Sequence, residues 1–144
     1  MKFSRTIAVI LLLLAGSAMQ LPGQSKDADR KQFEAIKARA DKGDAEAQLS
    51  VASHYASGTG VARDSAKAAK YIRKAAEQGL SRAQCLLGLL YSNGEGVKPD
   101  KVEAARWLRR AADQGLAEAQ FDLGMCYAAG DGVPRNAAEA VEWC

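Results

Sequence analysis

Apolar residues in the middle of the chain recur at the spacing of an amphipathic helix. Ala83, Leu87 and Tyr91 follow one another at intervals of four residues, so they form one stripe that we expect a helix to bury. Gly88 lies beside this stripe, where its missing side chain would let a neighbouring helix approach closely. The segment Gly94-Glu95-Gly96 predicts the end of this helix and a turn, because glycine readily adopts the positive φ of a helix C-cap.

A second amphipathic helix is predicted after this turn. Asp100 is suited to cap its first turn, since a carboxylate there accepts hydrogen bonds from free backbone N–H groups, and Glu103 would complete a capping box. The helix should stop at Gly115. The side chains that we expect it to bury are Ala104, Trp107, Leu108, Ala111 and Ala112. The two helices and their turn form a hairpin.

The same hairpin recurs at an offset of 36 residues. Eleven of the 28 positions in residues 81–108 are identical in residues 117–144, whereas unrelated sequences of ordinary composition would share about two. The offset also reaches back to a first copy that includes Gln48, Tyr55, Gly58 and Gly60. One hairpin cannot bury its apolar faces alone, so the copies must stack. The sequence therefore predicts an all-α fold, an α-solenoid of stacked antiparallel hairpins.

This pattern resembles the Sel1-like repeat family, relatives of the tetratricopeptide repeats with a longer turn between the helices. The resemblance is carried by Ala-Gln-x-x-Leu-Gly-x-x-Tyr-x-x-Gly-x-Gly-Val, followed by Asp-x-x-x-Ala-x-x-Trp/Tyr-x-x-x-Ala-Ala-x-x-Gly, and it covers residues 45–144. It implies adaptor and scaffold roles in protein–protein interaction, often in bacterial envelopes or secretion. It implies no substrate and no catalytic residues.

The chain divides into segments before and within the repeats. Residues 1–18 have the basic start, apolar run and small residues of a secretory signal peptide, and the apolar run of ten is too short to span a bilayer. Residues 19–29 are predicted to form a flexible lead-in, and residues 30–44 an N-terminal capping helix. The predicted repeats are residues 45–80, residues 81–116 and an incomplete third copy, residues 117–144.

Charge and composition exclude two classes of protein. The 144 residues carry a net charge of +3, which falls to +1 when Lys2 and Arg5 leave with the signal, so a basic surface for nucleic acid is not expected. Aromatic residues make up 6% of the chain, which disfavours a large β-sandwich core. We expect an exported protein, periplasmic or secreted, without a nucleic-acid partner and without stable membrane insertion after signal removal.

No set of residues in the sequence predicts catalysis, a metal or a cofactor. His54 is the only histidine, and no Cys-x-x-Cys pair accompanies it as a zinc site would need. No serine has a lysine three residues later, as in the serine enzymes that act on β-lactams. The Gly-x-Gly segments lack the Gly-Lys-Ser/Thr of a phosphate-binding loop, and their recurrence every 36 residues indicates turns. We expect a protein that is not an enzyme.

Two interpretations of the cysteines stay open. Cys126 and Cys144 hold the inward-facing positions of Leu90 and Leu108 in the preceding copy, so a disulfide between the helices of the last hairpin is a candidate in an oxidising compartment. Such a bond requires Cα atoms within about 7 Å of each other. Alternatively, these two residues and Cys85 are small buried hydrophobic side chains.

Positions that differ between the copies predict a binding surface. Three positions of the first helix, at i, i+3 and i+7, share one face and change from copy to copy. They hold Ser50, Ser53 and Ser57 in the first copy, Leu86, Leu89 and Asn93 in the second, and Asp122, Met125 and Ala129 in the third. Because the resemblance implies that first helices line the concave side, we expect a groove with Leu86, Leu89 and Met125 as apolar anchors. Alternatively, Leu86 and Leu89 pack between neighbouring hairpins.

The predicted function is that of a non-catalytic adaptor that binds a peptide or helix of another protein in this groove. A second hypothesis is a binder or hydrolase of envelope glycans or β-lactam-like ligands, because some secreted cysteine-rich members of the resembled family are linked to β-lactam binding. A third hypothesis is a remnant of a longer array, since the second helix of the last copy stops after Trp143.

Overall fold

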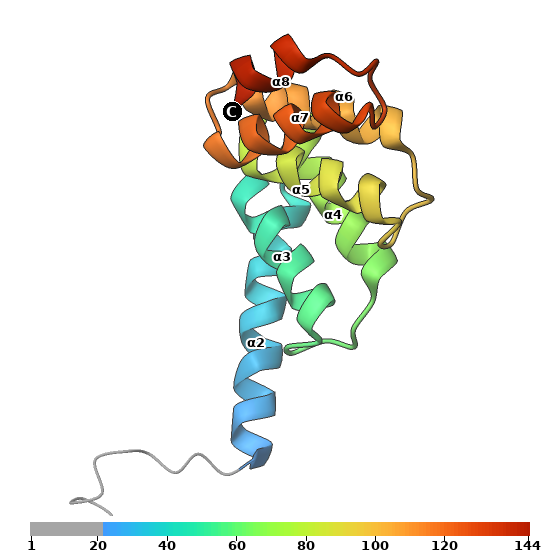
Figure 1. Ribbon diagram of the computed structural model, residues 1–144. Helices are drawn as coiled ribbons and strands as arrows, with labels where there is room; N and C mark the ends of the chain where they lie inside the picture. Colours follow the sequence, from blue (N-terminus) through green and yellow to red (C-terminus); the bar gives the residue numbers. More distant parts are fainter. Residues whose placement is uncertain (1–21) are drawn as a thin grey trace, which may run out of the picture.

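The computed structural model describes residues 22–144, which form a stack of α-helices with no strand in that range (Figure 1). The helices are α2 (Pro22–Asp41), α3 (Ala45–Ser57), α4 (Ser65–Glu77), α5 (Ser81–Asn93), α6 (Lys101–Asp113), α7 (Ala117–Ala129) and α8 (Ala137–Trp143). The last six form three antiparallel hairpins, and each helix packs mainly against its neighbours in the sequence. The predicted α-solenoid is confirmed. The predicted signal peptide lies outside the described residues.

Small residues let the two helices of each hairpin approach closely. Leu87 of α5 is fully buried, and Gly88 follows it at the contact with α6. A side-chain carbon at Gly88 would lie 2.8 Å from Cγ of Leu108 and 3.1 Å from the carbonyl oxygen of Ala104. The first distance is shorter than side-chain carbon contacts allow and the second is a tight contact, so any side chain at Gly88 would force α6 or Leu108 to shift. The close approach predicted at Gly88 is confirmed.

The helix caps differ in one respect from the prediction. The Asp100 carboxylate accepts hydrogen bonds from the backbone N–H groups of Val102 and Glu103, each at 3.0 Å, as expected of an N-cap. However, the N–H of Asp100 donates to the carbonyl oxygen of Tyr91 at 2.9 Å, so it is not free for Glu103. Glu103 instead accepts a hydrogen bond from Arg106 at 2.8 Å. The predicted capping box is therefore wrong.

The second glycine of each Gly-x-Gly turn packs against the helix that precedes its hairpin. Gly96 has a φ of +69°, and a side-chain carbon there would overlap the carbonyl group of Ser65 in α4. Gly132 contacts Lys101 in the same way, and Gly60 contacts Asp29 of α2. Asp29, Ser65 and Lys101 are themselves 36 residues apart. This contact therefore fixes how closely successive hairpins stack.

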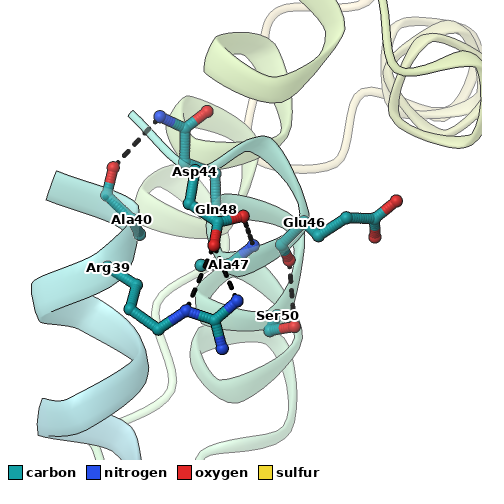
Figure 2. Close-up of polar contacts among 7 residues, drawn as sticks. All are labelled: Arg39, Ala40, Asp44, Glu46, Ala47, Gln48 and Ser50. Carbon is teal, nitrogen blue, oxygen red and sulfur yellow. Dashed lines mark hydrogen bonds and ion pairs between the residues drawn. The ribbon is translucent and has the colours of Figure 1, made fainter. Parts of the chain in front are cut away.

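Polar contacts also join α2 to the first hairpin, as Figure 2 shows. The amide Nε2 of Gln48, a residue that is 5% exposed, donates a hydrogen bond to the carbonyl oxygen of Ala40 at 3.1 Å. Nearby, the Asp44 carboxylate accepts a hydrogen bond from the N–H of Ala47 and pairs with Arg39 at 2.7 Å. Asp44 thus caps α3 and ties it to the end of α2.

The contact made by Gln48 recurs as a glutamine column along the stack. The column consists of Gln48, Gln84 and Gln120, which donate to the carbonyl oxygens of Ala40, Ala76 and Ala112 respectively. The amide oxygens of Gln48 and Gln84 in turn accept hydrogen bonds from Gln78 and Gln114. Buried amides need such partners, because an unsatisfied polar group in the core is costly.

The helix α2 begins earlier than predicted. It starts at Pro22, so residues 22–29 are helical and the prediction of a flexible lead-in is wrong for them, as is a capping helix that starts at residue 30. Ala28 occupies the position at which Asp64 and Asp100 cap later helices, and alanine has no side chain that could cap a helix there. Without a cap the helix continues backward to a proline, which the first turn of a helix tolerates.

The buried face of α2 includes one large aromatic side chain. Phe33, which is 3% exposed, packs edge-on against the ring of Tyr55 with ring centroids 5.5 Å apart. Ala35, which aligns with the buried Tyr71 of the next copy, is exposed. Phe33, and not Ala35, therefore provides the large buried side chain of α2.

Candidate functional site

A cavity of about 230 Å³ lies between the first helices of the second and third hairpins. Its walls come from α5, α6, α7 and the turn after α7. The lining residues are Leu89, Ser92, Leu108, Asp122, Met125, Cys126, Ala129 and Asp131. The cavity exists because α5 and α7 belong to successive hairpins and are separated by α6, which packs against both.

The structure brings some of the predicted binding residues together. Leu89, Asp122 and Met125 all line the cavity. Leu86, which is 39% exposed, lines a smaller depression of about 90 Å³ with Arg82, Cys85 and Glu118. The exposed residues Ser50, Ser53 and Asn93 line neither space. Leu86 is exposed and Leu89 only partly buried, so the two do not form buried packing between hairpins.

One exposed apolar residue beside this site escapes sequence reasoning. Phe121 of α7 is 57% exposed and lies one helical turn before Met125. The same position holds Leu49 and Cys85 in earlier copies, and Cys85 is only 2% exposed, so the alignment predicts a core residue. The next hairpin covers Cys85, whereas no described helix lies in the corresponding place over α7. Phe121 is therefore exposed although its equivalent Cys85 is buried.

Asp122 is a carboxylate that no cation neutralises. In residues 22–144, no side-chain ion pair includes it. Burial raises the pKa of Asp122 above its usual range, and the charge of Glu118 one turn earlier raises it further. Asp131, on the same cavity wall, is instead paired with Lys101 at 2.7 Å. The cavity therefore contains one compensated and one uncompensated acidic group.

Asp122→Asn is expected to raise Tm at pH 7. The pKa of Asp122 is raised in the folded state, so its ionisation lowers the free energy of unfolding at every pH above that raised pKa. This loss of stability disappears as the pH falls, until Asp122 is protonated in both the folded and the unfolded state. Asparagine carries no charge, so thermal melts of the two proteins should differ at pH 7 and converge near pH 3. Glu95→Gln, in an exposed turn, is the control and should leave Tm nearly unchanged. A gain that grows on acidification would contradict this account.

The cysteines do not form the candidate disulfide. Cys85, Cys126 and Cys144 are free thiols in the described chain. Burial raises the pKa of the Cys85 thiol to about 11 and also raises the pKa of the Cys126 thiol, so both thiols stay protonated at neutral pH. Cys144 is exposed, although its Sγ lies against Gly124 of α7. The interpretation as buried hydrophobic residues is thus confirmed for Cys85, whereas Cys126 is partly buried.

Histidine and the acidic residues form no further site in the described range. The Nδ1 atom of His54 lies 2.8 Å from the carbonyl oxygen of Thr59, to which its N–H donates, and the ring packs against Phe33. Across residues 22–144 no group of three or more metal-ligating side chains is found. In the same range, no helix combines the length and apolar character needed to cross a membrane.

A comparison with protein families finds the Sel1 repeat in this chain. The sequence model of that repeat matches residues 45–80, 81–116 and 117–144. These ranges correspond to the hairpins α3–α4, α5–α6 and α7–α8. No curated protein sequence matches the chain at a significant level.

Several solved structures resemble the chain. One is c5321, a protective antigen present in uropathogenic Escherichia coli strains that displays an SLR fold, with 42% identity and a TM-score of 0.75 over 77% of this chain. The match spans only 24% of c5321. A Sel1 repeat protein from Oxalobacter formigenes has 38% identity and a TM-score of 0.72, over 78% of this chain and 85% of its own. The cysteine rich protein B of Helicobacter pylori, with 24% identity and a TM-score of 0.61 over 86% of each chain, shares the fold.

Proposed function

Since the chain belongs to the Sel1 repeat family, we propose that it is a non-catalytic adaptor that binds an apolar peptide or helix of another protein on its first helices. Proteins of this family are generally scaffolds for protein interaction and lack catalytic activity. In this proposal the partner lies along the concave face of the solenoid, over α5 and α7, with an apolar side chain in the cavity between them.

The distribution of exposed apolar side chains is the observation that carries this proposal. Leu86 of α5 and Met125 of α7 are 39% and 51% exposed. Met125 lines the cavity together with Leu89, and Leu86 lines the neighbouring depression. A cluster of large exposed apolar residues is typical of a protein-binding surface.

Preformed helices would make such binding efficient. The cavity walls belong to helices whose core positions, such as Leu87 and Leu123, are fully buried, so the scaffold is ordered before a partner arrives. Binding then requires little further ordering of this protein, and less of the interaction free energy is lost as conformational entropy. The partner alone would lose conformational freedom.

We also propose that the protein is exported, to the periplasm or beyond. Support comes from the sequence of residues 1–18, with Lys2 and Arg5 before an apolar run and with small residues after it. N-terminal sequencing of the protein from cell envelopes tests this. A mature start shortly after Ala18 is expected, whereas an intact Met1 would contradict cleavage.

Met125→Asp should abolish retention of the partner protein. A charge at this position would have to be desolvated against an apolar ligand, so we expect at least about a tenfold loss of affinity. The matched control is Val102→Asp, because Val102 of α6 is also 51% exposed but lies outside the cavity. The measurement is capture from an envelope extract with the wild type and both variants, each checked by circular dichroism. Equal retention by all three would contradict the proposal.

A further inference from the structure

The strongest unexplained feature of the cavity is the position of Asp122. Its side chain is partly buried on a wall that also contains Leu89 and Met125, and no ion pair of residues 22–144 reaches it. A partly desolvated carboxylate without a cation lowers the stability of the protein that carries it. Nothing in the packing of α7 requires an acid there, since the equivalent positions in the earlier copies hold Ser50 and Leu86.

The charged groups around Asp122 do not compensate it. Glu118, one turn earlier on α7, adds a second negative charge. Lys101 of α6 is already paired with Asp131 at 2.7 Å. Arg82 of α5 lines the depression that contains Glu118, but no ion pair joins the two residues.

The remaining titratable neighbours of Asp122 are two thiols. Cys85 of α5 and Cys126 of α7 both lie close enough for the Asp122 charge to raise their pKa values. Protonated thiols are neutral and cannot balance a carboxylate. The first helices therefore present a negative group inside an apolar surface, with the compensating cation missing.

We propose that the segment bound between α5 and α7 carries a lysine or arginine whose cation pairs with Asp122. This inference rests on the proposed function and specifies the chemistry of the partner: an apolar segment with one basic side chain. The aliphatic stem of that side chain would lie along Leu89 and Met125, and its charged end would reach the carboxylate. Such a pair would select partners by charge as well as by apolar surface.

Three small probes that share one apolar chain test this inference without knowledge of the partner. They are n-hexylammonium, 1-hexanol and heptanoate, which share a hexyl chain and carry a cationic, a neutral and an anionic head group. Binding is followed by NMR of the Met and Leu methyl groups of the wild-type protein. We expect the Met125 and Leu89 signals to shift, with hexylammonium bound about fivefold or more tightly than hexanol and with heptanoate bound weakest.

Two variants separate the charge effect from the apolar effect. Asp122→Asn should remove the preference for hexylammonium over hexanol, whereas Glu95→Gln, a charge change in an exposed turn, should retain it. Equal binding of hexylammonium and hexanol to the wild type, or an unchanged preference in Asp122→Asn, would overturn the inference and leave the proposed apolar site intact. Methyl signals that no probe shifts would overturn both the inference and the cavity as a binding site.

Discussion

Gly96→Ala is expected to lower the free energy of unfolding by about 2–5 kcal/mol, a large share of the stability of a domain this size. Gly96 has a φ of +69°, a conformation that costs an alanine about 1–2 kcal/mol. In addition, the new methyl group would overlap the carbonyl group of Ser65, with the carbonyl carbon only 2.7 Å away. Because that carbonyl belongs to the first turn of α4, relief of the overlap requires the second hairpin to move away from the first.

The control for this prediction separates backbone strain from the overlap. Gly79 also has a positive φ, +93°, but a side-chain carbon there would meet nothing within 4 Å. Gly79→Ala should therefore lose only about 1–2 kcal/mol. Urea unfolding of both variants, followed by circular dichroism, measures the difference. Equal losses would show that the contact between Gly96 and α4 does not contribute to the stacking of the hairpins.

Leu87→Ala is expected to lower the free energy of unfolding by about 2–5 kcal/mol, because it leaves a cavity in the packed interior. Leu87 of α5 is fully buried in the hydrophobic core that α5 forms with the neighbouring helices. The adjacent residue Leu86 offers a matched control, since it is 39% exposed on the other face of the same helix. Leu86→Ala should lose less than about 1 kcal/mol.

The pair of leucine variants also separates stability from binding. We expect Leu87→Ala to shift the urea midpoint strongly, and Leu86→Ala to shift it little while it weakens partner capture. If Leu86→Ala destabilised the protein as much as Leu87→Ala, Leu86 would be a structural contact between hairpins, and its place in the proposed binding surface would be lost.

The architecture could be predicted because the sequence contains internal copies that can be compared with one another. The 36-residue offset identified the hairpins and the α-solenoid. The spacing of Ala83, Leu87 and Tyr91 identified the inward stripe, in which Ala83 and Leu87 are fully buried and Tyr91 is partly buried. Gly88 could be assigned to a close contact because the residue type leaves few other reasons for a glycine in mid-helix. These features depend on the spacing of residues along the chain, which can be read directly from the sequence.

The hydrogen-bond partners of side chains could not be predicted in the same way, because several donors that are close in space can compete for one acceptor. Trp107 and Trp143 are equivalent by sequence, yet the indole N–H of Trp143 donates to Glu139 at 3.2 Å, whereas that of Trp107 is buried and has no partner in the described chain. Glu103, the equivalent of Glu139, accepts a hydrogen bond from Arg106 and none from Trp107. In the last copy a glutamate replaces that arginine.

For the candidate site, too, one part could be predicted from the sequence and another part could not. Internal variation placed Leu89, Asp122 and Met125 on one face, and the structure gathers them around one cavity. Variation alone could not show that Ser50 and Ser53 lie away from it, or that the carboxylate at Asp122 has no counter-ion whereas Asp131 has one. Those facts depend on distances between α5, α6 and α7, which no single helix pattern contains.

The glutamine column has a consequence for how such chains change length over generations. Every 36-residue unit carries both halves of the junction: the glutamine that donates, such as Gln84, and a helix end whose carbonyl oxygen accepts, such as that of Ala112. A tandem duplication of the corresponding coding segment would create a new junction in which donor and acceptor already match. Arrays of this kind can therefore gain or lose whole units in one genetic step, whereas an insertion between an acceptor such as Ala76 and the glutamine eight residues later would separate the two.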